Sequence, residues 1–489
     1  MIRNKLRTSG TTILSALLCV LIGLVIGFTV LSVLSYISKN NAYQAQAQVY
    51  ADGQYSKGDV NKVKKYLESL DAEDADAEEA RKGRQSVQDS MGGKYTAEQL
   101  LEVCKALLAE KPQGKAYTAE QVSAAAAGVV GAENEDAAAV LSEAMKDVLL
   151  KSYEFSFGDV IAYAYEMGFK RVLLGGWYMP ADGGPQLEIG KAAPLIMTGL
   201  SVAFAFKTGL FNIGAAGQYT LGAFGALLFA LVLKWPWYLC VLAAVLFGAL
   251  WGAIPGIFKA YCNVNEVITS IMFNWIGLYA VNTIMYGGGN SPMYDLQSSK
   301  TWTVVSQSKQ SQIPDLGSGF FVQPASIAIF IAVLVAVALW VILNKTTFGY
   351  ELKACGLSKT AAKYAGINEK RNIILSMTIA GALAGLGGAL YYLSGSPQWN
   401  PQDSTALPAM GFDGISVALL ASSNPIGSIF SALFISHISI GGTFMEAGSF
   451  PMEVANIISG VIIYLCAFMM LFKNRIAKLF TRKEKGGNK

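Results

Sequence analysis

Repeated apolar stretches, each about as long as a bilayer is thick, constrain this chain more than any other feature. A transmembrane helix needs about 20 predominantly apolar residues. Such stretches occur at about 12–37, 191–208, 213–233, 237–259, 264–286, 324–343, 372–394, 408–421, 425–441 and 454–472. The stretches 408–421 and 425–441 are short and carry polar residues. The sequence therefore predicts an all-α polytopic membrane protein with about ten transmembrane helices, and eight is the alternative.

The composition agrees with this class and argues against several kinds of site. Of 489 residues, 53% are apolar and only 15% are charged, which is too little charge for a water-soluble chain of this length. The six cysteines show no CxxC spacing, so neither a disulfide framework nor a zinc site is expected. The single histidine, His437, cannot build a metal centre by itself. It is expected to form an interhelical hydrogen bond, and a proton relay is the alternative.

No catalytic pattern is visible either. Residues 184–191 (GPQLEIGK) superficially resemble a phosphate-binding loop, but the glycine spacing is one residue off and Ala192 replaces the magnesium-binding hydroxyl. No nucleophile, base and orienting acid occur together. We therefore expect that the chain is not an enzyme and binds no cofactor or metal of its own.

The distribution of basic residues predicts the orientation, because loops on the cytoplasmic side carry an excess of Lys and Arg. Arg3, Lys5 and Arg7 precede the first apolar stretch, which is interpreted as a retained transmembrane helix rather than a signal peptide. Ten spans then place the basic segments 344–371 and 473–489 inside as well. The outer loops carry few basic residues. Both termini are therefore expected in the cytoplasm.

A long polar segment, 40–165, separates the first two spans and is expected outside the cell. It is rich in Ala, Glu, Asp and Lys and is predicted to be helical. Thr96 with Gln99, and Thr118 with Gln121, each have the spacing of a capping box, in which two residues satisfy each other's backbone N–H groups. This repeat predicts a small duplicated helical unit. It is interpreted as a spacer or docking domain, and a ligand-binding sensor is the alternative.

The expected organisation follows from these segments. It comprises an N-terminal tail with the first transmembrane helix (1–39), the extracellular helical insertion (40–165), a membrane-approach segment (166–190), a membrane core (191–472) that contains a cytoplasmic loop (345–371), and a basic cytoplasmic tail (473–489).

A run of Gly, Asn and Gln interrupts the core at 209–221 (GLFNIGAAGQYTL). Irregular backbone at membrane depth survives only where it is buried in protein or lines a watery path. We therefore expect this break to border a route for a solute. The candidate path residues are polar or aromatic side chains within the spans, and a purely structural role is the alternative for each of them. They are Asn212, Gln218, Asn274, Trp275, Phe412 and Asp413.

The loop 348–371 (FGYELKACGLSKTAAKYAGINEKR) has the pattern of a docking helix. Gly356 is expected to break one element, Ser358 to cap a short helix, and Gly366 to end that helix. A short helix between two spans, with small residues on one side and Lys on the other, suits insertion into a cleft of another protein.

Four segments together resemble the permease subunits of bacterial ATP-binding-cassette (ABC) importers, in the branch that takes up nucleosides, within the wider group for ribose-type sugars and branched-chain amino acids. The similarity runs from about 190 to 472. The segments are Phe211–Gly214, Asn265–Met272, Gly356 with Ala361–Ile367, and Gly411–Ile415. Two departures stand out: the family usually has Glu where this chain has Ala216, and the insertion 40–165 is much longer than the usual first outer loop.

The resemblance implies a set of partners. These are a second homologous permease, a cytoplasmic ATPase that carries ATP and Mg, and an extracellular solute-binding protein, often a lipoprotein. It implies a bacterial plasma-membrane protein that binds no nucleic acid. The ATPase is expected to dock on Gly356, Ala361, Ala362, Tyr364, Gly366 and Ile367.

The function expected is that of a permease subunit that imports nucleosides, or a related ribose-bearing solute, with energy from ATP hydrolysis on another chain. A secondary transporter driven by an ion gradient is one alternative, although acidic residues in the spans are scarce. A receptor with an extracellular sensor is another, although the tail after Lys473 is short for an output domain. The exact solute, the pairing of permeases and the purpose of the insertion are left open by the sequence.

Overall fold

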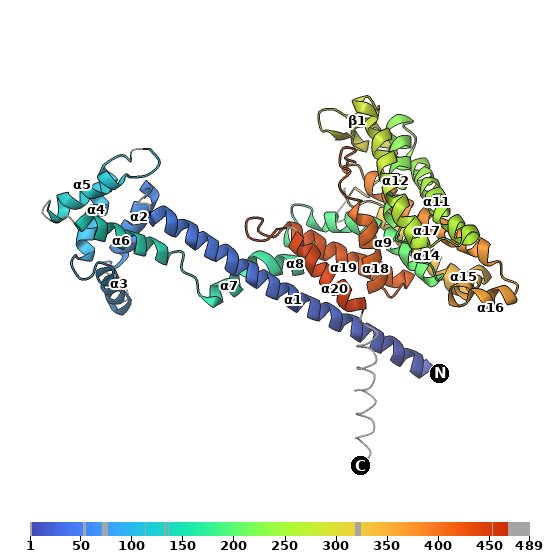
Figure 1. Ribbon diagram of the computed structural model, residues 1–489, viewed down its shortest axis with the longest axis horizontal. Helices are drawn as coiled ribbons and strands as arrows, with labels where there is room; N and C mark the ends of the chain where they lie inside the picture. Colours follow the sequence, from blue (N-terminus) through green and yellow to red (C-terminus); the bar gives the residue numbers. More distant parts are fainter. Residues whose placement is uncertain are drawn as a thin grey trace, which may run out of the picture. The chain divides into compact units, whose positions relative to one another are not determined.

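A computed structural model describes residues 2–51, 55–70, 77–112, 114–131, 134, 136–317, 324–451 and 453–467. The chain forms two compact units, Met1–Thr29 with Glu166–Lys489, and Val30–Tyr165. Helices dominate the described residues, and β1 (Tyr294–Asp295) and β2 (Lys300–Thr301) pair as a short antiparallel hairpin. The all-α class is therefore confirmed (Figure 1). The predicted tail 473–489 lies outside the described residues.

Each predicted apolar stretch overlaps a helix. These helices are α1 (Ile2–Ala51), α9 (Gly184–Lys207), α10 (Ala215–Leu227) with a π-helical turn η3 (Leu228–Val232), α11 (Trp237–Cys262), α12 (Glu266–Tyr286), α14 (Ala328–Lys345), α17 (Glu369–Tyr392), α18 (Ala409–Leu420), α19 (Pro425–Thr443) and α20 (Glu453–Ala467). Among the described residues, 8 helices are long and apolar enough to cross a membrane, while Ala409–Leu420 and Glu453–Ile462 are shorter apolar helices.

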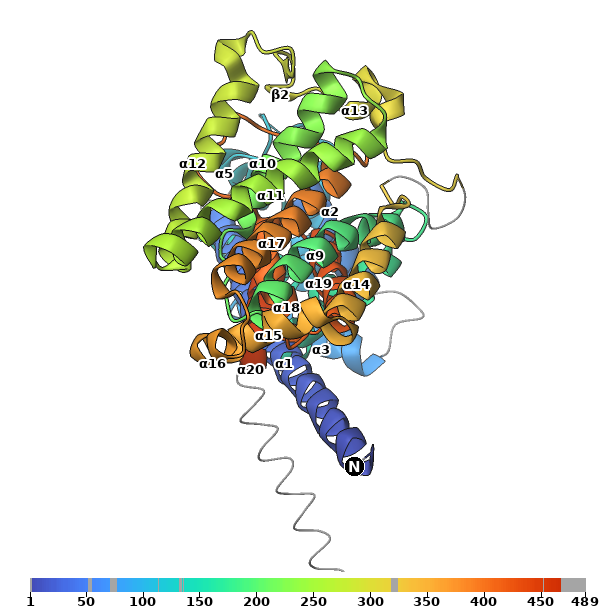
Figure 2. The ribbon, with the colours of Figure 1, turned by 90° about the vertical axis from the view of Figure 1, so that its right-hand side faces the viewer.

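Helices α9, α10 and α17 form the centre of the larger unit. In their most apolar windows 78, 83 and 72% of the residues are buried, against 33% in α11 and 28% in α14. A helix buried on all sides belongs to the interior, and one with an exposed apolar face suits contact with lipid. Figure 2 shows α9 and α17 between α11 and α14. These three helices are therefore the interior of the larger unit.

Glycines allow the central helix α17 and its neighbour α11 to approach backbone to backbone. A Cβ atom on Gly381 of α17 would lie 2.3 Å from the carbonyl oxygen of Gly248 on α11, and one on Gly385 would lie 2.9 Å from the Cα of Gly248. Close approach of this kind increases the van der Waals contact that drives helix association in lipid. The glycines at these positions are therefore part of the packing.

Short elements connect the spans of this unit. They are η1 (Tyr165–Phe169), α8 (Lys170–Leu174), η2 (Gly175–Tyr178), η4 (Gly287–Gly289), α13 (Val304–Gln307), η5 (Lys309–Ser311), α15 (Thr347–Leu357) and α16 (Lys359–Tyr364). Helices α15 and α16 lie at the end of the unit opposite the β1–β2 hairpin (Figure 2).

The second unit packs its own apolar core. Its helices are the C-terminal part of α1, α2 (Lys57–Leu70), α3 (Ala77–Ser90), α4 (Ala97–Ala109), α5 (Ala119–Val130), α6 (Ala137–Lys151) and α7 (Phe157–Ala164). The core side chains include Val63, Leu100, Cys104, Leu141 and Met145, each fully buried. The unit is therefore a small helical domain with a continuous interior.

Both predicted capping boxes are formed. The backbone N–H of Gln99 donates to Thr96 Oγ1 at 3.3 Å and that of Thr96 to Gln99 Oε1 at 2.8 Å. Thr118 and Gln121 make the same pair of bonds, at 3.3 and 3.2 Å. Residues Ser156 and Asp159 form a third box, at the start of α7, which the sequence analysis did not identify because Asp takes the place of Glu or Gln.

We expect Cys104 to resist alkylation in the folded protein. Burial raises the pKa of its thiol to about 12, so raising the pH from about 7 to about 9, across the ordinary thiol pKa of about 8.5, produces almost no thiolate there. Peptide mass spectrometry after iodoacetamide treatment measures this, with the exposed Cys262 as the internal control. Equal labelling of Cys104 and Cys262 before denaturation would show that the helical domain is not packed as described.

Candidate functional site

The break between α9 and α10 is shorter than the sequence predicts. Only residues 208–214 are non-helical or turn-like, with Gly209 at φ +74°, and α10 begins at Ala215. Gln218 therefore lies inside a helix and not in the break. The difference arises because the backbone N–H groups at the start of α10 have partners: Gln218 N donates to Gly214 O at 3.0 Å and Gly217 N to Asn274 Oδ1 at 2.8 Å.

The three predicted amides meet at this break. Asn212 and Gln218 exchange a reciprocal pair of side-chain hydrogen bonds, at 2.7 and 3.0 Å, and Asn212 Nδ2 also donates to Ser201 Oγ at 3.0 Å. Asn274 on α12 accepts from Gly217 N and donates from Nδ2 to Ile213 O at 3.0 Å. All three side chains are buried, at 0 to 1% exposure. The amides therefore bind one another and the backbone, and fix the course of the chain at the break.

Ser270 is a polar neighbour that the sequence analysis missed. It lies on α12 one turn before Asn274, and its buried hydroxyl has no hydrogen-bond partner among the described residues. A Cβ on Gly214 would lie 3.2 Å from Ser270 Cβ. In the sequence, only its position within the segment Asn265–Met272 indicated that Ser270 could belong to the site.

The connection between α17 and α18 is held by a second buried amide on α12. Asn282 Nδ2 donates to Asp403 O at 2.9 Å and to Ser404 Oγ at 3.0 Å, and Asn282 Oδ1 accepts from Trp399 Nε1 at 2.7 Å. The loop 393–408 is therefore anchored to the same helix that anchors the break.

Helix α18 begins part-way along α9. Its 12 residues correspond to a length of about 18 Å, which is less than the hydrocarbon thickness of about 30 Å. A Cβ on Gly411 would lie 2.4 Å from Ala216 Cα, and one on Gly414 would lie 2.7 Å from the carbonyl carbon of Thr198, in the interior of α9. The N-terminal turns of α18 thus lie within the helical layer and not at its surface.

The remaining predicted path residues differ from the amides in being partly exposed. Phe412, on the first turns of α18, is 39% exposed and Asp413 beside it is half-buried. Trp275 on α12 is also half-buried and stacks on Tyr279, with ring centroids 5.8 Å apart. The structure therefore brings Asn212, Gln218 and Asn274 into one cluster and leaves these three side chains outside its hydrogen bonds.

Lys191 is a charged side chain within the apolar helix α9 that the sequence analysis did not select. It is half-buried, and its Nζ donates to Ser439 Oγ on α19. A charged residue inside an apolar helix is the sequence feature that could have identified Lys191, but the sequence analysis treats it only as the end of a segment that resembles a phosphate-binding loop.

His437 on α19 forms interhelical hydrogen bonds, as expected. Its Nδ1 lies 3.2 Å from each carboxylate oxygen of Glu188 on α9, and its Nε2 lies 2.8 Å from Leu173 O. Glu188 Oε2 also accepts from Gly176 N at 3.1 Å. The pair therefore holds the segment 173–176 against α9 and α19.

The predicted docking segment forms two helices, α15 and α16. Ser358 caps α16 by accepting from Ala361 N at 3.3 Å, and Gly366 ends it at φ +78°, with Ile367 N donating to Ala362 O at 3.0 Å. Ala362 is buried, whereas Tyr364 and Leu357 are 90% exposed. Large apolar side chains that are exposed on a short capped helix are typical of a surface that contacts another protein.

The prediction that Gly356 breaks an element is wrong, because α15 continues through it to Leu357. The residue serves a close contact instead. A Cβ on Gly356 would lie 2.7 Å from Gly209 N, and one on Gly209 would lie 2.4 Å from Gly356 Cα. The end of α15 therefore touches the first residues of the break, backbone against backbone.

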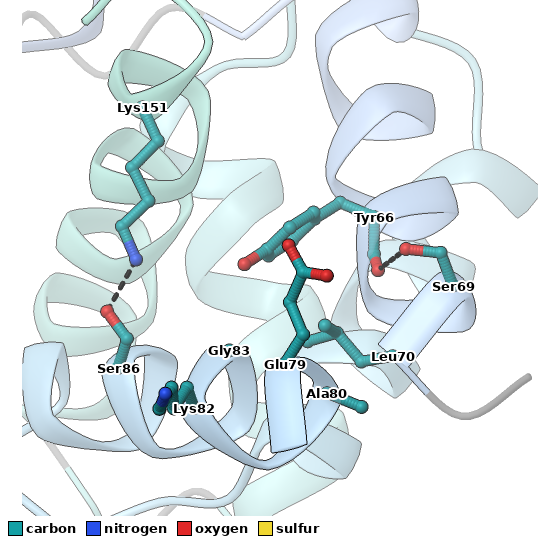
Figure 3. Close-up of a pocket in the computed structure, with 9 residues that line it drawn as sticks. All are labelled: Tyr66, Ser69, Leu70, Glu79, Ala80, Lys82, Gly83, Ser86 and Lys151. Atoms are coloured by element: carbon teal, nitrogen blue, oxygen red, sulfur yellow. Dashed lines mark hydrogen bonds between the residues drawn. The ribbon is translucent and has the colours of Figure 1, made fainter. Parts of the chain in front are cut away.

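The helical domain contains a hollow of about 490 Å³ between α2, α3 and α6. Figure 3 shows Glu79 from α3 and Lys151 from α6 on different walls, with the Tyr66 ring between them. Lys151 Nζ donates to Ser86 Oγ, and none of the predicted path residues lines the hollow. No group of three or more potential metal ligands occurs among the described residues.

A family comparison covers most of the larger unit. The family described as branched-chain amino acid transport system / permease component matches residues 188–467. The chain belongs to this permease family. The match includes the break, the docking segment and α18, and it does not include the helical domain between α1 and α9.

Similar proteins give the same assignment. The permease is 38% identical over 305 residues to the guanosine ABC transporter permease protein NupP of Bacillus subtilis, which covers 61% of this chain and 84% of that protein. It is 35% identical over 308 residues to the nucleoside ABC transporter permease protein NupB of Lactococcus lactis (60% and 84%). It is 31% identical over 312 residues to the glucose ABC transporter permease protein TsgB13 of Haloferax volcanii (60% and 78%). No solved structure matches the permease.

We expect Asn274→Ala to destabilise the permease. The substitution leaves Gly217 N–H and Ile213 C=O buried without their partners, which costs about 2 kcal/mol or more and lowers the unfolding temperature in detergent. Asn344→Ala is the matched control, because Asn344 is exposed and bonds only within α14. Equal unfolding temperatures for the two variants would contradict the role given to Asn274.

Proposed function

We propose that this permease is the transmembrane subunit of an ABC importer that carries nucleosides into the cell, with ATP hydrolysed by a partner subunit. The observation that carries the proposal is the similarity to the guanosine and nucleoside permeases, which extends over 84% of each of them. The glucose permease is less similar, and it makes a sugar the second candidate. The two candidates are chemically related, because a nucleoside contains a sugar, ribose.

The proposed partners are a second homologous permease, a cytoplasmic ATPase that holds ATP and Mg, and an extracellular solute-binding lipoprotein. We place the protein in a bacterial plasma membrane with both termini inside, so that 40–165 is extracellular. The exposed Tyr364 and Leu357 support docking of the ATPase, because each presents a large apolar surface on an otherwise basic loop that contains Lys353, Lys359 and Lys363.

The docking segment has a direct route to the central helices. Gly356 touches Gly209 at the break, and the break is tied to α12 through Asn274 and to α17 through the hydroxyl pair Thr208–Ser376. Packed helices shift against one another as units when one of them is moved. A displacement of α15 by the ATPase is thus delivered to the start of α10, next to the proposed path.

The function is tested by uptake into proteoliposomes that contain the whole complex with its binding protein. We expect radiolabelled guanosine to accumulate only when ATP and Mg²⁺ are supplied on the ATPase side, and to persist when ionophores collapse ion gradients. Unlabelled adenosine competes in this assay and glucose does not. Uptake without ATP would identify a secondary transporter, and competition by glucose alone would identify a sugar importer.

We expect Gly356→Ala to uncouple the complex. The added Cβ would lie 2.7 Å from backbone atoms of Thr208 and Gly209, so α15 and the break have to separate. The measured quantity is guanosine transported per ATP hydrolysed, which falls several-fold while ATP hydrolysis continues. The matched control is Gly460→Ala, where a Cβ meets no atom within 4 Å. An unchanged ratio in Gly356→Ala would rule out this contact as the route of coupling.

A further inference from the structure

No residue of the proposed solute path or of the docking segment lines the hollow in the helical domain. Its volume of about 490 Å³ lies within the range of about 300–1,000 Å³ that small-molecule sites occupy. The lining residues come from α2, α3 and the end of α6. The helical domain therefore builds the whole hollow by itself.

A glycine inside a helix shapes one side of the hollow. Gly83 lies in the middle of α3, a position where glycine is less favourable than alanine. A Cβ there would lie 2.6 Å from Leu70 Cδ2 and 3.3 Å from the hydroxyl oxygen of Tyr66. The missing side chain therefore lets Tyr66, from α2, lie close against α3 at the hollow.

Two oppositely charged side chains border the hollow from different walls. Glu79 lies in the first turn of α3 and Lys151 in the last turn of α6. Lys82, the third charged residue of the lining, is paired with Glu78 at 2.7 Å. By contrast, Lys151 Nζ donates to Ser86 Oγ, and no ion pair of Glu79 or Lys151 occurs among the described residues. Both groups therefore keep their charge available at the hollow.

The helix dipole favours both charges where they are, but it does not account for their arrangement. An acid in a first turn and a base in a last turn are each stabilised by the dipole. Glu98, in the first turn of α4, follows the same rule and does not line the hollow. At the hollow, an acceptor and a donor stand on different walls with an aromatic ring between them (Figure 3).

These three groups match a planar base that has donors on one edge and acceptors on another. Guanine is such a base, because its 2-amino group donates while O6 and N7 accept. A carboxylate accepts from N–H groups, a lysine ammonium donates to O6 or N7, and an aromatic side chain packs against the face of a base. The hydroxyls of Ser69 and Ser86, which also line the hollow, have the chemistry to bond a ribose.

We propose that the hollow of the helical domain binds a guanine nucleoside. Glu79 accepts from the N1–H and 2-amino groups, Lys151 donates to O6 or N7, and Tyr66 packs against the base. The choice of a nucleoside rests on the proposed function. With 40–165 extracellular, as proposed above, the domain meets the nucleoside before import, and the insertion has the role of a solute-binding domain.

The first test locates the ligand on the complete transporter complex, without its solute-binding protein and without ATP. The complex is acetylated at lysines with and without guanosine close to its solubility limit, and peptides are analysed by mass spectrometry. We expect guanosine to reduce acetylation of Lys151 several-fold and to leave Lys111 unchanged. Lys111 is exposed and does not line the hollow. Equal acetylation of Lys151 in both samples would overturn the proposal.

The second test assigns the acceptor. The guanosine concentration that half-protects Lys151 measures the affinity of this hollow alone. Glu79→Gln is expected to weaken that affinity about tenfold or more, because a hydrogen-bond acceptor loses its charge. Adenosine, which lacks the N1–H and 2-amino groups, is expected to bind more weakly and to be little affected. The matched control is Glu98→Gln, which neutralises a first-turn acid away from the hollow. Equal affinities in the two variants would contradict the role of Glu79.

The third test concerns the ring. Tyr66→Phe keeps the aromatic surface and is expected to keep most of the affinity, whereas Tyr66→Leu is expected to lower it about fivefold or more. The same affinity in both variants would contradict packing of the base on Tyr66. Should Tyr66→Leu fail to assemble, Glu79→Gln decides alone, because it keeps the size of the side chain.

Failure of this site differs from failure of the proposed function. If the complex imports guanosine with ATP but guanosine leaves Lys151 unprotected, the hollow is not a guanosine site and the importer stands. If guanosine protects Lys151 but the complex imports no nucleoside, the site stands and the proposed function is wrong.

Discussion

The satisfaction of buried polar groups at the break between α9 and α10 is the constraint on which the rest of the larger unit depends. A chain that leaves a helix inside a membrane exposes N–H and C=O groups for which hydrocarbon offers no partner. Asn274 supplies one acceptor and one donor to that backbone, and Asn212 and Gln218 satisfy each other. With these bonds in place α10 can start at Ala215 and run through the most buried part of the protein.

The same region also requires glycine at several positions, because a side chain there would separate neighbouring backbones. Gly209 and Gly356 touch through their backbones, as do Gly248 and Gly381 between α11 and α17. Each contact brings together segments far apart in the sequence, and each would be separated by a single methyl group. The amides fix where the chain goes, and the glycines fix how near the next helix can come. Together they connect the docking segment to the central helices without an intervening loop.

Sequence reasoning predicted the helical elements well, because a span needs an unbroken apolar stretch and a capping box has a fixed spacing. It failed at positions whose role is set by a distant neighbour. Gln218 looked like part of a break because its run is rich in glycine, and the partner that permits a helix there, Asn274, is 56 positions away. Gly356 looked like a helix breaker for the same reason, although its neighbour is Gly209 on another element.

The candidate path shows the same limit. Asp413 could be selected from the sequence because an acid among apolar residues is rare. Its surroundings could not be predicted, since nothing in the local pattern indicates that the flanking Gly411 and Gly414 lie against Ala216 and Thr198. Gly411 packs against Ala216, so the start of the helix that carries Asp413 lies beside the start of α10.

Helix α12 anchors two irregular connections at once. Asn274 holds the break before α10, and Asn282, about two turns further along, holds the loop that leads into α18. Because one helix carries both amides, the two connections are linked through a single rigid element. Any tilt of α12 that strains the hydrogen bonds of Asn274 also strains those of Asn282, so the break before α10 and the loop before α18 cannot rearrange independently.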